Sequence, residues 1–312
     1  MHDTFVLAVD IGGTKFETAV VGGDGSIVPG TRLRRATGRA RDRGKTVAAL
    51  RASIAESLAA APSPVFAAGI GSAGPVDLLA GTVSPHNLPL LGGLPVREIV
   101  ADAAGVPAVL RLDGTCIAVA ESWLGATRGS EVSMSMVVST GVGGGIVVDG
   151  RPLAGASGNA GHIGQIHVHV GEPTAAVEDS TLEAVASGPA TVRWARARGW
   201  EGRSGEDLAR GILAGDPIAE EATRRSARLV GQAVASTATL LDLESVAIGG
   251  GFARVRPDYV DIVRRSAHDN ALFAYARRVR IAPSGLGDEG PLLGAAALAL
   301  HGGAASLEPV AP

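Results

Sequence analysis

Two glycine-rich segments, residues 6–21 and 136–148, constrain the fold of this chain more than any other feature. The first reads VLAVDIGGTKFETAVV and the second MVVSTGVGGGIVV. In each, an apolar strand ends in a small polar residue, a glycine turn follows, and a second β-rich segment begins. Glycines allow a backbone to approach an anion closely and to point successive N–H groups at it. The repetition of this unit predicts two related lobes that hold a polyphosphate.

The segments that follow the two turns argue against the common nucleotide-binding loops. A Walker-type loop or a dinucleotide fingerprint opens a helix, whose N-terminus completes the anion site. Here Lys15 is followed by FETAVV and the turn GGDG, and Gly145 is followed by IVV and the turn Asp149-Gly150, so both predict strands. The run Gly12-Gly13-Thr14-Lys15 also lacks the upstream glycine of a Walker loop. Two hairpins without a ligand are the alternative, because glycine marks turns in general; the pairing of the two units disfavours it.

The rest of the chain alternates predicted helices and strands. Helical spacing or composition favours helices over residues 46–61, 96–104, 115–124, 180–199, 205–243 and 291–300, the fourth and fifth of these being largely helical. Strands are expected over residues 65–70, 106–112 and 246–248, the last ending in Gly249-Gly250-Gly251. The arginine-rich residues 32–43 are expected to form an exposed connection. Strands, crossovers and a duplicated hairpin together predict an α/β chain of two lobes.

Composition narrows the class of protein. With 312 residues, 46% of them apolar, the chain can bury one large core or two lobes of ordinary size. The net charge of −3 gives no electrostatic case for a nucleic-acid partner. No apolar stretch approaches the ~18 residues of a membrane helix, and the N-terminus has no signal-peptide layout. Cys116 is the only cysteine, which excludes an intramolecular disulfide and a thiolate metal cluster. We expect a cytoplasmic protein.

Two aspartates occupy positions suited to phosphoryl transfer, which needs the γ-phosphate held, a metal placed and a base for the attacking hydroxyl. Asp10 ends the first strand and could hold Mg²⁺ directly or through water. Asp113 follows the apolar strand VPAVLRL and precedes a helix, where it could accept the proton of a substrate hydroxyl. The alternative is that Asp113 only caps the helix that starts near Thr115. Loop N–H groups and polar side chains can hold the phosphates, namely those of Thr14, Lys15 and Thr140.

Further motifs recur in order along nearly the whole chain. They are DIGGTK at 10–15, GSAGPVD at 71–77, NLP at 87–89, STGVGGGIVVDG at 139–150, LEAVASGPA at 182–190, IGGG at 248–251 and the tail GDEGPLLGAAALAL. In this set the chain resembles the ROK family, which contains bacterial sugar kinases and sugar-responsive repressors. The resemblance implies a two-lobed actin-like ATPase (ribonuclease H-like) fold with the active site in the interlobe cleft. It also implies a small lobe of residues 1–114 plus 295–312, a large lobe of residues 115–294, and a homodimer.

The resemblance assigns roles to particular residues, with ATP and Mg²⁺ as cofactors and a sugar or cyclitol as substrate. Asp113 falls where these kinases keep their catalytic base, which overturns the interpretation as a cap alone. Asp10, Gly12, Gly13, Thr14 and Lys15, with Thr140, Gly141, Gly143 and Gly144, would bind the ATP phosphates, and Gly249, Gly250 and Gly251 would lie near the adenosine. The acceptor site would comprise Asn87, Leu112, Asp113, His162, Gln165 and Glu183.

The chain departs from the family pattern around the acceptor. The family motif N-D-A-N is Leu112-Asp113-Gly114-Thr115 here, and G-E-x-G-H is residues 161–165, with His162 and Gln165 at its second and last positions. The zinc motif C-x-C-G-x-x-G-C-x-E corresponds to residues 174–183, where every cysteine is absent and only Glu183 is kept. We therefore predict no zinc site. A replacement metal site at His162, His167 and His169 is the less favoured alternative.

These departures predict an altered substrate. Leu112 and His162 replace an amide and a carboxylate that would normally bind sugar hydroxyls, and a site that loses a polar partner generally matches a ligand lacking that polar group. The favoured function is an ATP-dependent kinase acting on a primary hydroxyl of a hexose-like ring, with a modified sugar or a C7-cyclitol as acceptor. The alternatives are an ordinary glucokinase or hexose kinase, a non-catalytic sugar-sensing regulator, and an inactive kinase-like structural partner. Family repressors carry an extra N-terminal DNA-binding segment, and none precedes the first strand, so we expect catalysis.

Overall fold

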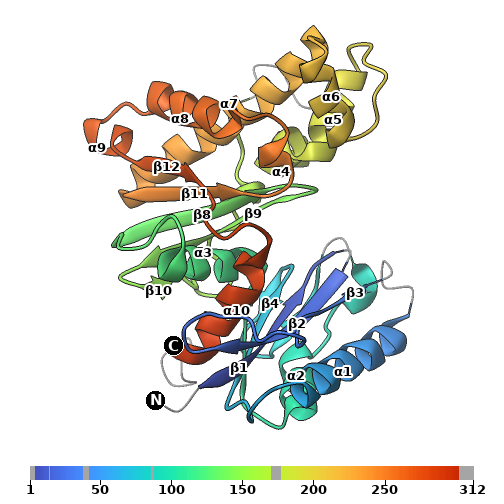
Figure 1. Cartoon of the computed structure of the whole chain (residues 1–312). Coiled ribbons are helices and arrows are strands. Elements are labelled where there is room, and N and C mark those ends of the chain that lie inside the picture. Colours follow the sequence, from blue (N-terminus) through green and yellow to red (C-terminus); the bar gives the residue numbers. More distant parts are fainter. Residues whose placement is uncertain (1–3, 14, 38–41, 86–87, 170–176, 302–312) are drawn as a thin grey trace. The chain divides into compact units, whose positions relative to one another are not determined.

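The computed structural model describes residues 4–301 apart from residues 14, 38–41, 86–87 and 170–176. The chain divides into two compact units (Figure 1). Unit 1 comprises Met1–Leu124, Pro152–Ala160 and Asp288–Pro312, and unit 2 comprises Gly125–Arg151 and Gly161–Gly287. The expected boundaries at residues 114 and 295 fall inside two helices, α3 (Asp113–Leu124) and α10 (Gly290–His301). Each of these helices belongs as a whole to unit 1, because both pack along its sheet.

Unit 1 is built on a five-stranded sheet with the order β3-β2-β1-β4-β7. Its strands are β1 (Phe5–Ile11), β2 (Lys15–Gly22), β3 (Leu33–Ala36), β4 (Ala68–Ser72) and β7 (Ala108–Leu112), and a separate two-stranded sheet joins β5 (Val76–Asp77) to β6 (Thr82–Val83). β1 pairs antiparallel with β2 and parallel with β4, so the first glycine turn joins neighbouring strands. The predicted hairpin is confirmed.

Helices cover both faces of this sheet (Figure 1). α1 (Arg43–Ala59), α2 (Val96–Ala104) and the 3₁₀ helix η2 (Pro89–Leu91) accompany one face, and α3 and α10 accompany the other. The 3₁₀ helix η6 (Gly287–Glu289) directly precedes α10. Alternate residues of β1, such as Leu7 and Val9, belong to the apolar core on the α1 and α2 side. On the opposite side a Cβ at Gly69 would overlap the backbone of Ala295, so the absence of a side chain lets α10 lie directly on β4.

Unit 2 repeats the arrangement with a five-stranded sheet of order β10-β9-β8-β11-β12. Its strands are β8 (Val132–Val138), β9 (Val142–Val148), β10 (Arg151–Pro152), β11 (Ser245–Gly249) and β12 (Arg280–Pro283). Its helices are α4 (Leu182–Ala186), α5 (Gly188–Arg196), α6 (Gly205–Leu213), α7 (Pro217–Leu241), α8 (Tyr259–Asn270) and α9 (Ala274–Arg277), with the 3₁₀ helices η3 (Ile163–Gln165), η4 (Val177–Ser180) and η5 (Phe252–Arg254). Asp149 and Gly150 both have positive φ, as the predicted tight turn after β9 requires.

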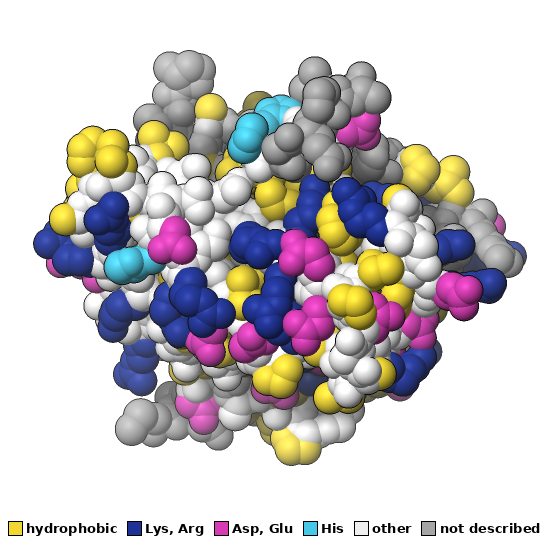
Figure 2. Space-filling view, turned by 90° about the horizontal axis from the view of Figure 1, so that it is seen from above, with side chains coloured by type: hydrophobic (Ala, Val, Ile, Leu, Met, Phe, Trp, Pro, Cys, Tyr) yellow, Lys and Arg dark blue, Asp and Glu magenta, His cyan; other side chains and the backbone are white. Residues whose placement is uncertain are grey.

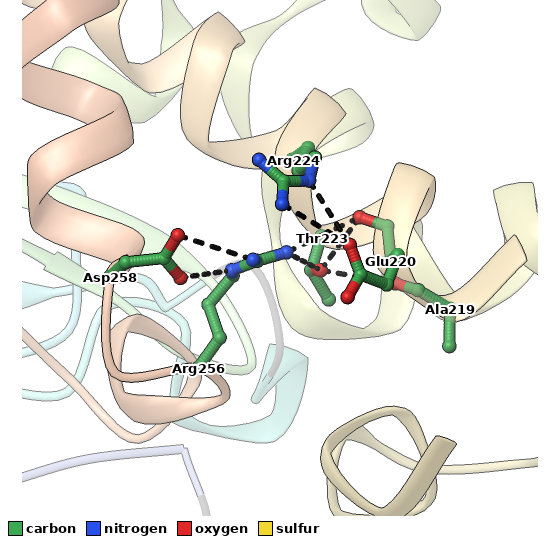
Figure 3. Close-up of polar contacts among 6 residues, drawn as sticks. All are labelled: Ala219, Glu220, Thr223, Arg224, Arg256 and Asp258. Atoms are coloured by element: carbon green, nitrogen blue, oxygen red, sulfur yellow. Dashed lines mark hydrogen bonds and ion pairs between the residues drawn. The ribbon is translucent and has the colours of Figure 1, made fainter. Parts of the chain in front are cut away.

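A buried arginine ties α7 to the start of α8 in unit 2 (Figure 3). The side chain of Arg256 is 5% exposed and donates from Nε and Nη2 to the two carboxylate oxygens of Asp258, at 2.5 and 3.2 Å. Its Nη1 donates to Thr223 Oγ1 at 3.2 Å and to the carbonyl of Glu220 at 3.4 Å. These four hydrogen bonds connect the guanidinium to α7 and to Asp258, and they fix the loop between η5 and α8.

One expectation from the sequence was wrong in detail. Residues 32–43 are not simply an exposed connection, because Leu33–Ala36 forms β3 and pairs antiparallel with β2. The two segments expected to be largely helical are so, each with a break: Ser187 separates α4 from α5, and Asp216 caps α7 by accepting from the N–H groups of Ile218 and Ala219. No helix among the described residues is long and apolar enough to span a bilayer.

Candidate active site

The first glycine turn joins β1 to β2 and is closed by backbone hydrogen bonds. The N–H of Gly12 donates to the carbonyl of Lys15 at 2.9 Å, and Thr37 Oγ1 donates to the carbonyl of Gly13 at 3.2 Å. A Cβ at Gly12 would lie 3.2 Å from that Lys15 oxygen, so the turn favours glycine there. Thr14 lies outside the described residues. Because the chain leaves the turn as a strand, the turn is not a Walker-type loop.

Asp10 and Asp113 are carboxylates of unit 1 whose charges interact. Asp10 is 9% exposed, and its pKa is raised to about 7, first by burial and then by the charges of Asp113 and Glu17. Lys15 and Arg34 act in the opposite direction on the same pKa. Asp113 is the first residue of α3, and its Oδ1 accepts from the N–H of Gly114 at 2.7 Å. A buried carboxyl group crowded by like charges fits a hard divalent cation, which prefers oxygen ligands and restores the charged form.

Asp10 belongs to a row of residues that crosses the sheet on the side of α3 and α10. Arg34 is the register partner of Glu17, Glu17 of Asp10, and Asp10 of Gly71. Register partners project from the same face of a sheet. A Cβ at Gly71 would lie 3.0 Å from Cys116 Sγ and 3.7 Å from Asp10 Oδ1, so this glycine makes room beside the aspartate.

Cys116 is a structural thiol. It is fully buried, and its pKa is raised well above the ordinary value by burial and by the charges of Asp10 and Asp113. A thiol held in the protonated form is a poor nucleophile and a poor metal ligand. On this side of the sheet, the side chains suited to bind a metal ion or a phosphate are therefore the carboxylates and the basic groups.

The second glycine turn lies in unit 2 between β8 and β9. The N–H of Ser139 donates to the carbonyl of Gly141 at 2.9 Å, and the N–H of Gly188 donates to the carbonyl of Ser139 at 2.9 Å. The N–H of Val142 donates to Glu183 Oε2 at 2.8 Å, so the carboxylate from α4 holds the start of β9. Thr140 is exposed at the tip of the turn. Gly188, at the start of α5, thus contacts this turn, although sequence reasoning assigned it no role beyond its motif.

The remaining predicted phosphate and adenosine glycines occupy distinct settings. Gly143 and Gly144 lie within β9, opposite Val137 and Met136 of β8. A Cβ at Gly144 would lie 2.9 Å from Ile163 Cγ2, so close packing requires glycine at this position. A Cβ at Gly143 would meet no atom within 4 Å. Gly249 ends β11, and Gly250 and Gly251 follow it. Gly250 has φ +101°, and a Cβ there would overlap the carbonyl of Val138, while a Cβ at Gly251 would lie 3.7 Å from Ser139 Oγ. The structure therefore brings residues 249–251 to the second turn.

The predicted acceptor residues are divided between the two units. Leu112, at the end of β7, is 2% exposed and belongs to the apolar core of unit 1. His162 is half-buried in unit 2, and Gln165 Nε2 donates to Glu183 Oε1 at 3.3 Å. Glu183 therefore contacts both the second turn and Gln165. Asn87 lies outside the described residues.

The family zinc segment has few metal-binding groups in this chain. His167 Nδ1 lies 2.7 Å from Ser180 Oγ, and His169 is exposed. Among the described residues no group of three His, Cys, Asp or Glu side chains is placed to hold a metal ion. Residues 170–176 are not described, so the prediction of no zinc remains a prediction.

Comparison with known proteins defines the class. The α/β fold with paired glycine turns is that of ROK hexokinase structures, which have the two-lobed actin-like ATPase fold. A ROK hexokinase from Thermus thermophilus superposes with a TM-score of 0.83 at 32% identity, covering 95% of this chain and 98% of that one. A ROK family glucokinase from Streptomyces griseus, in complex with glucose and AMPPNP, gives a TM-score of 0.81 at 29% identity, covering 96% and 100%.

The model of the ROK family matches residues 6–301, and the chain belongs to this family. Among curated relatives, the N-acetylmannosamine kinase of Escherichia fergusonii is 32% identical over 94% of this chain and 97% of that protein. The glucokinase of Thermotoga maritima is 27% identical over 94% and 96%. The relatives are sugar kinases, and the protein is an ATP-dependent phosphotransferase with an alcohol acceptor.

Proposed function

We propose that the protein transfers the γ-phosphoryl group of ATP to a primary hydroxyl of a hexose-like ring. The observation that carries this proposal is the pair of interacting carboxylates, Asp10 and Asp113, beside the glycine turn of unit 1. Asp113 would accept the proton of the attacking hydroxyl, and Asp10 would hold Mg²⁺, directly or through water. The metal would supply charge neutralisation at the phosphates. Backbone N–H groups of both glycine turns would hold the phosphate chain, with Lys15 and Thr140 beside them.

The acceptor is proposed to be a modified ring rather than glucose itself, such as an amino sugar, a deoxy sugar or a C7-cyclitol. The support comes from His162, where the family has a carboxylate, and from Leu112, where it has an amide. A leucine side chain offers no hydrogen-bonding group to a hydroxyl, and this favours a ring with a carbon or a deoxy position there. Curated relatives include kinases of N-acetylmannosamine and of glucose, so the family spans more than one acceptor.

An ADP-release screen over glucose, mannose, N-acetylmannosamine, deoxy sugars and C7-cyclitols tests the proposal, with Asp113→Asn as the matched inactive enzyme. We expect one of the modified rings to give the highest kcat/KM. Asp113→Asn should lower ADP release by about 10²–10⁴-fold with every acceptor while MgATP binding persists. Glucose as the clear best substrate would refute the altered acceptor site. Appreciable residual transfer by the Asn variant would remove Asp113 from the role of base.

The proposal also includes the absence of zinc, a homodimeric state, which rests on the family resemblance, and a cytoplasmic location, which rests on the composition. A sugar-sensing regulator is the alternative of another class, since the fold of a ROK family transcriptional regulator is also similar, with a TM-score of 0.83 at 24% identity. Two observations favour catalysis over regulation. Asp113 occupies the position of the family base, and on the face shown in Figure 2 basic and acidic side chains are interspersed without the large basic area typical of a DNA-binding surface.

A further inference from the structure

Four charged residues of unit 1 form a compact group, here called the Glu17 cluster: Lys15, Glu17, Arg32 and Arg34. Glu17 Oε1 accepts from Lys15 Nζ at 2.7 Å and forms an ion pair with Arg34 Nε at 2.8 Å. Glu17 Oε2 accepts from Arg32 Nε at 3.0 Å, and Arg32 Nη2 lies 3.0 Å from the same oxygen. All four side chains come from β2 and the β3 region, so one hairpin supplies the whole cluster.

The cluster has more positive charge than its own carboxylate needs. The Glu17 side chain is 3% exposed, whereas those of Lys15 and Arg34 are 40% and 52% exposed. A buried carboxylate is neutralised by one close cation, and the others remain available to an anion from outside. The hydrogen bonds of Glu17 lower its pKa, with Lys15 and Arg32 as donors against the opposing effect of burial, so the carboxylate stays charged and keeps its partners in place.

The two arginines of the cluster point to different neighbours. Arg34 is in register with Glu17, which is in register with Asp10, so its guanidinium stands on the same face as the aspartate at the glycine turn. Arg32 instead extends toward Glu289 of η6, with Nη1 3.4 Å from Glu289 Oε1. Arg32 is therefore occupied on both sides by carboxylates. Arg34 has Glu17 on one side only among the ion pairs of the described residues.

We propose that Arg34 binds the phosphate chain of the phosphoryl donor, and that Glu17 is the positioning residue that aims Arg34 and Lys15 at it. A guanidinium matches two phosphate oxygens at once and stays charged at all working pH values, which suits it to this role. The inference rests on the proposed function for the identity of the donor. It adds a specific phosphate ligand that no glycine or hydroxyl of the two turns supplies.

Equilibrium binding of MgATP, MgADP and adenosine, without acceptor, tests this with two matched variants. Arg34→Gln should weaken MgATP binding by roughly 10- to 100-fold, the range for loss of a charge-assisted hydrogen bond. The loss should be smaller for MgADP and absent for adenosine, and the salt dependence of MgATP binding should decrease. Arg34→Lys should restore part of the affinity. Arg32→Gln removes a cation from the same carboxylate and should change MgATP binding by less than about threefold.

Three outcomes would overturn the proposal. Equal losses in Arg34→Gln and Arg32→Gln, or an equal loss for adenosine, would show that the cluster only stabilises the hairpin. A wild-type protein that binds adenine nucleotides normally but transfers phosphate to no sugar or cyclitol would refute the proposed acceptor function and leave the role of Arg34 intact. A wild-type protein that binds no nucleotide would refute both.

Discussion

Asp10 is a buried carboxyl group, and its burial disfavours the charged form when no cation is bound. The pKa of its carboxyl is raised from 3.8 to about 7, so the folded protein binds the proton more tightly than the unfolded chain does. Stability from this proton is fully present below about pH 4 and is lost as the pH rises toward 7. At pH 7 about half of the free protein carries this buried charge, and the fraction rises above pH 7; a divalent cation would stabilise the charged form.

Asp10→Asn should consequently stabilise the metal-free protein at high pH and not at low pH. The gain over wild type should grow between about pH 4 and pH 8 and reach at most about 4 kcal/mol, because each pKa unit is worth about 1.4 kcal/mol. Urea unfolding in a chelating buffer at pH 4.5, 6 and 8 measures it. The same substitution should abolish stabilisation by MgATP. A difference between the two proteins that does not change with pH would contradict the assigned environment of Asp10.

Sequence reasoning predicted Asp10 and Asp113 and missed the charged residues Glu17 and Arg34 near them. The two aspartates could be predicted because each lies at the carboxyl end of an apolar strand, Asp10 in β1 and Asp113 directly after β7. Glu17 and Arg34 could not, because their contact depends on β3, and an arginine-rich stretch is more often solvent-exposed than a strand. Strand alternation in β2 was the available signal, since a glutamate among apolar residues FETAVV requires a cationic partner.

At the scale of elements, α10 depends on glycine for its position in unit 1. A Cβ at Gly294 would overlap the backbone of Cys116 in α3, just as one at Gly69 would overlap the backbone of Ala295. The helix is thus held against α3 on one side and β4 on the other at backbone distance. Neither contact is visible in the sequence, where GPLLGAAALAL reads only as an apolar helix. The bounds of such helices could be predicted, and the partners and closeness of their packing could not.

Gly294→Ala should therefore destabilise the protein although alanine is the better helix former. We expect a loss of about 2–3 kcal/mol, typical of overpacking against atoms that cannot move aside. Gly290→Ala is the matched control in the same helix, because its added Cβ would lie 3.8 Å from the Ile117 side chain, an ordinary contact. That variant should be neutral or more stable by up to about 1 kcal/mol. Thermal unfolding of both variants decides the matter, and similar midpoints would refute close packing of α10.

At the scale of the whole molecule, the chain has none of the cysteines of the zinc motif with which residues 174–183 align. Its single cysteine is buried in unit 1, so no thiolate set exists anywhere in the sequence. In unit 2 the two ends of the corresponding segment are joined by protein contacts instead. The N–H of Val168 donates to the carbonyl of Ser180 at 3.1 Å, and the N–H of Leu182 donates to the carbonyl of Ile166 at 2.9 Å. These bonds join residues 166–168 to residues 180–182.

Purified protein should accordingly contain less than stoichiometric zinc, and a chelator should leave its stability unchanged. A structural zinc contributes folding free energy directly, so its removal would lower the unfolding temperature sharply. Elemental analysis of protein prepared without an affinity tag, followed by thermal unfolding with and without EDTA, tests both points. His167→Ala is the control for the alternative in which histidines bind a metal. Because the partner of His167 is Ser180 rather than a metal, its loss should lower the free energy of unfolding by no more than about 1 kcal/mol. One zinc per chain, lost in that variant together with stability, would show that histidines had replaced the missing cysteines.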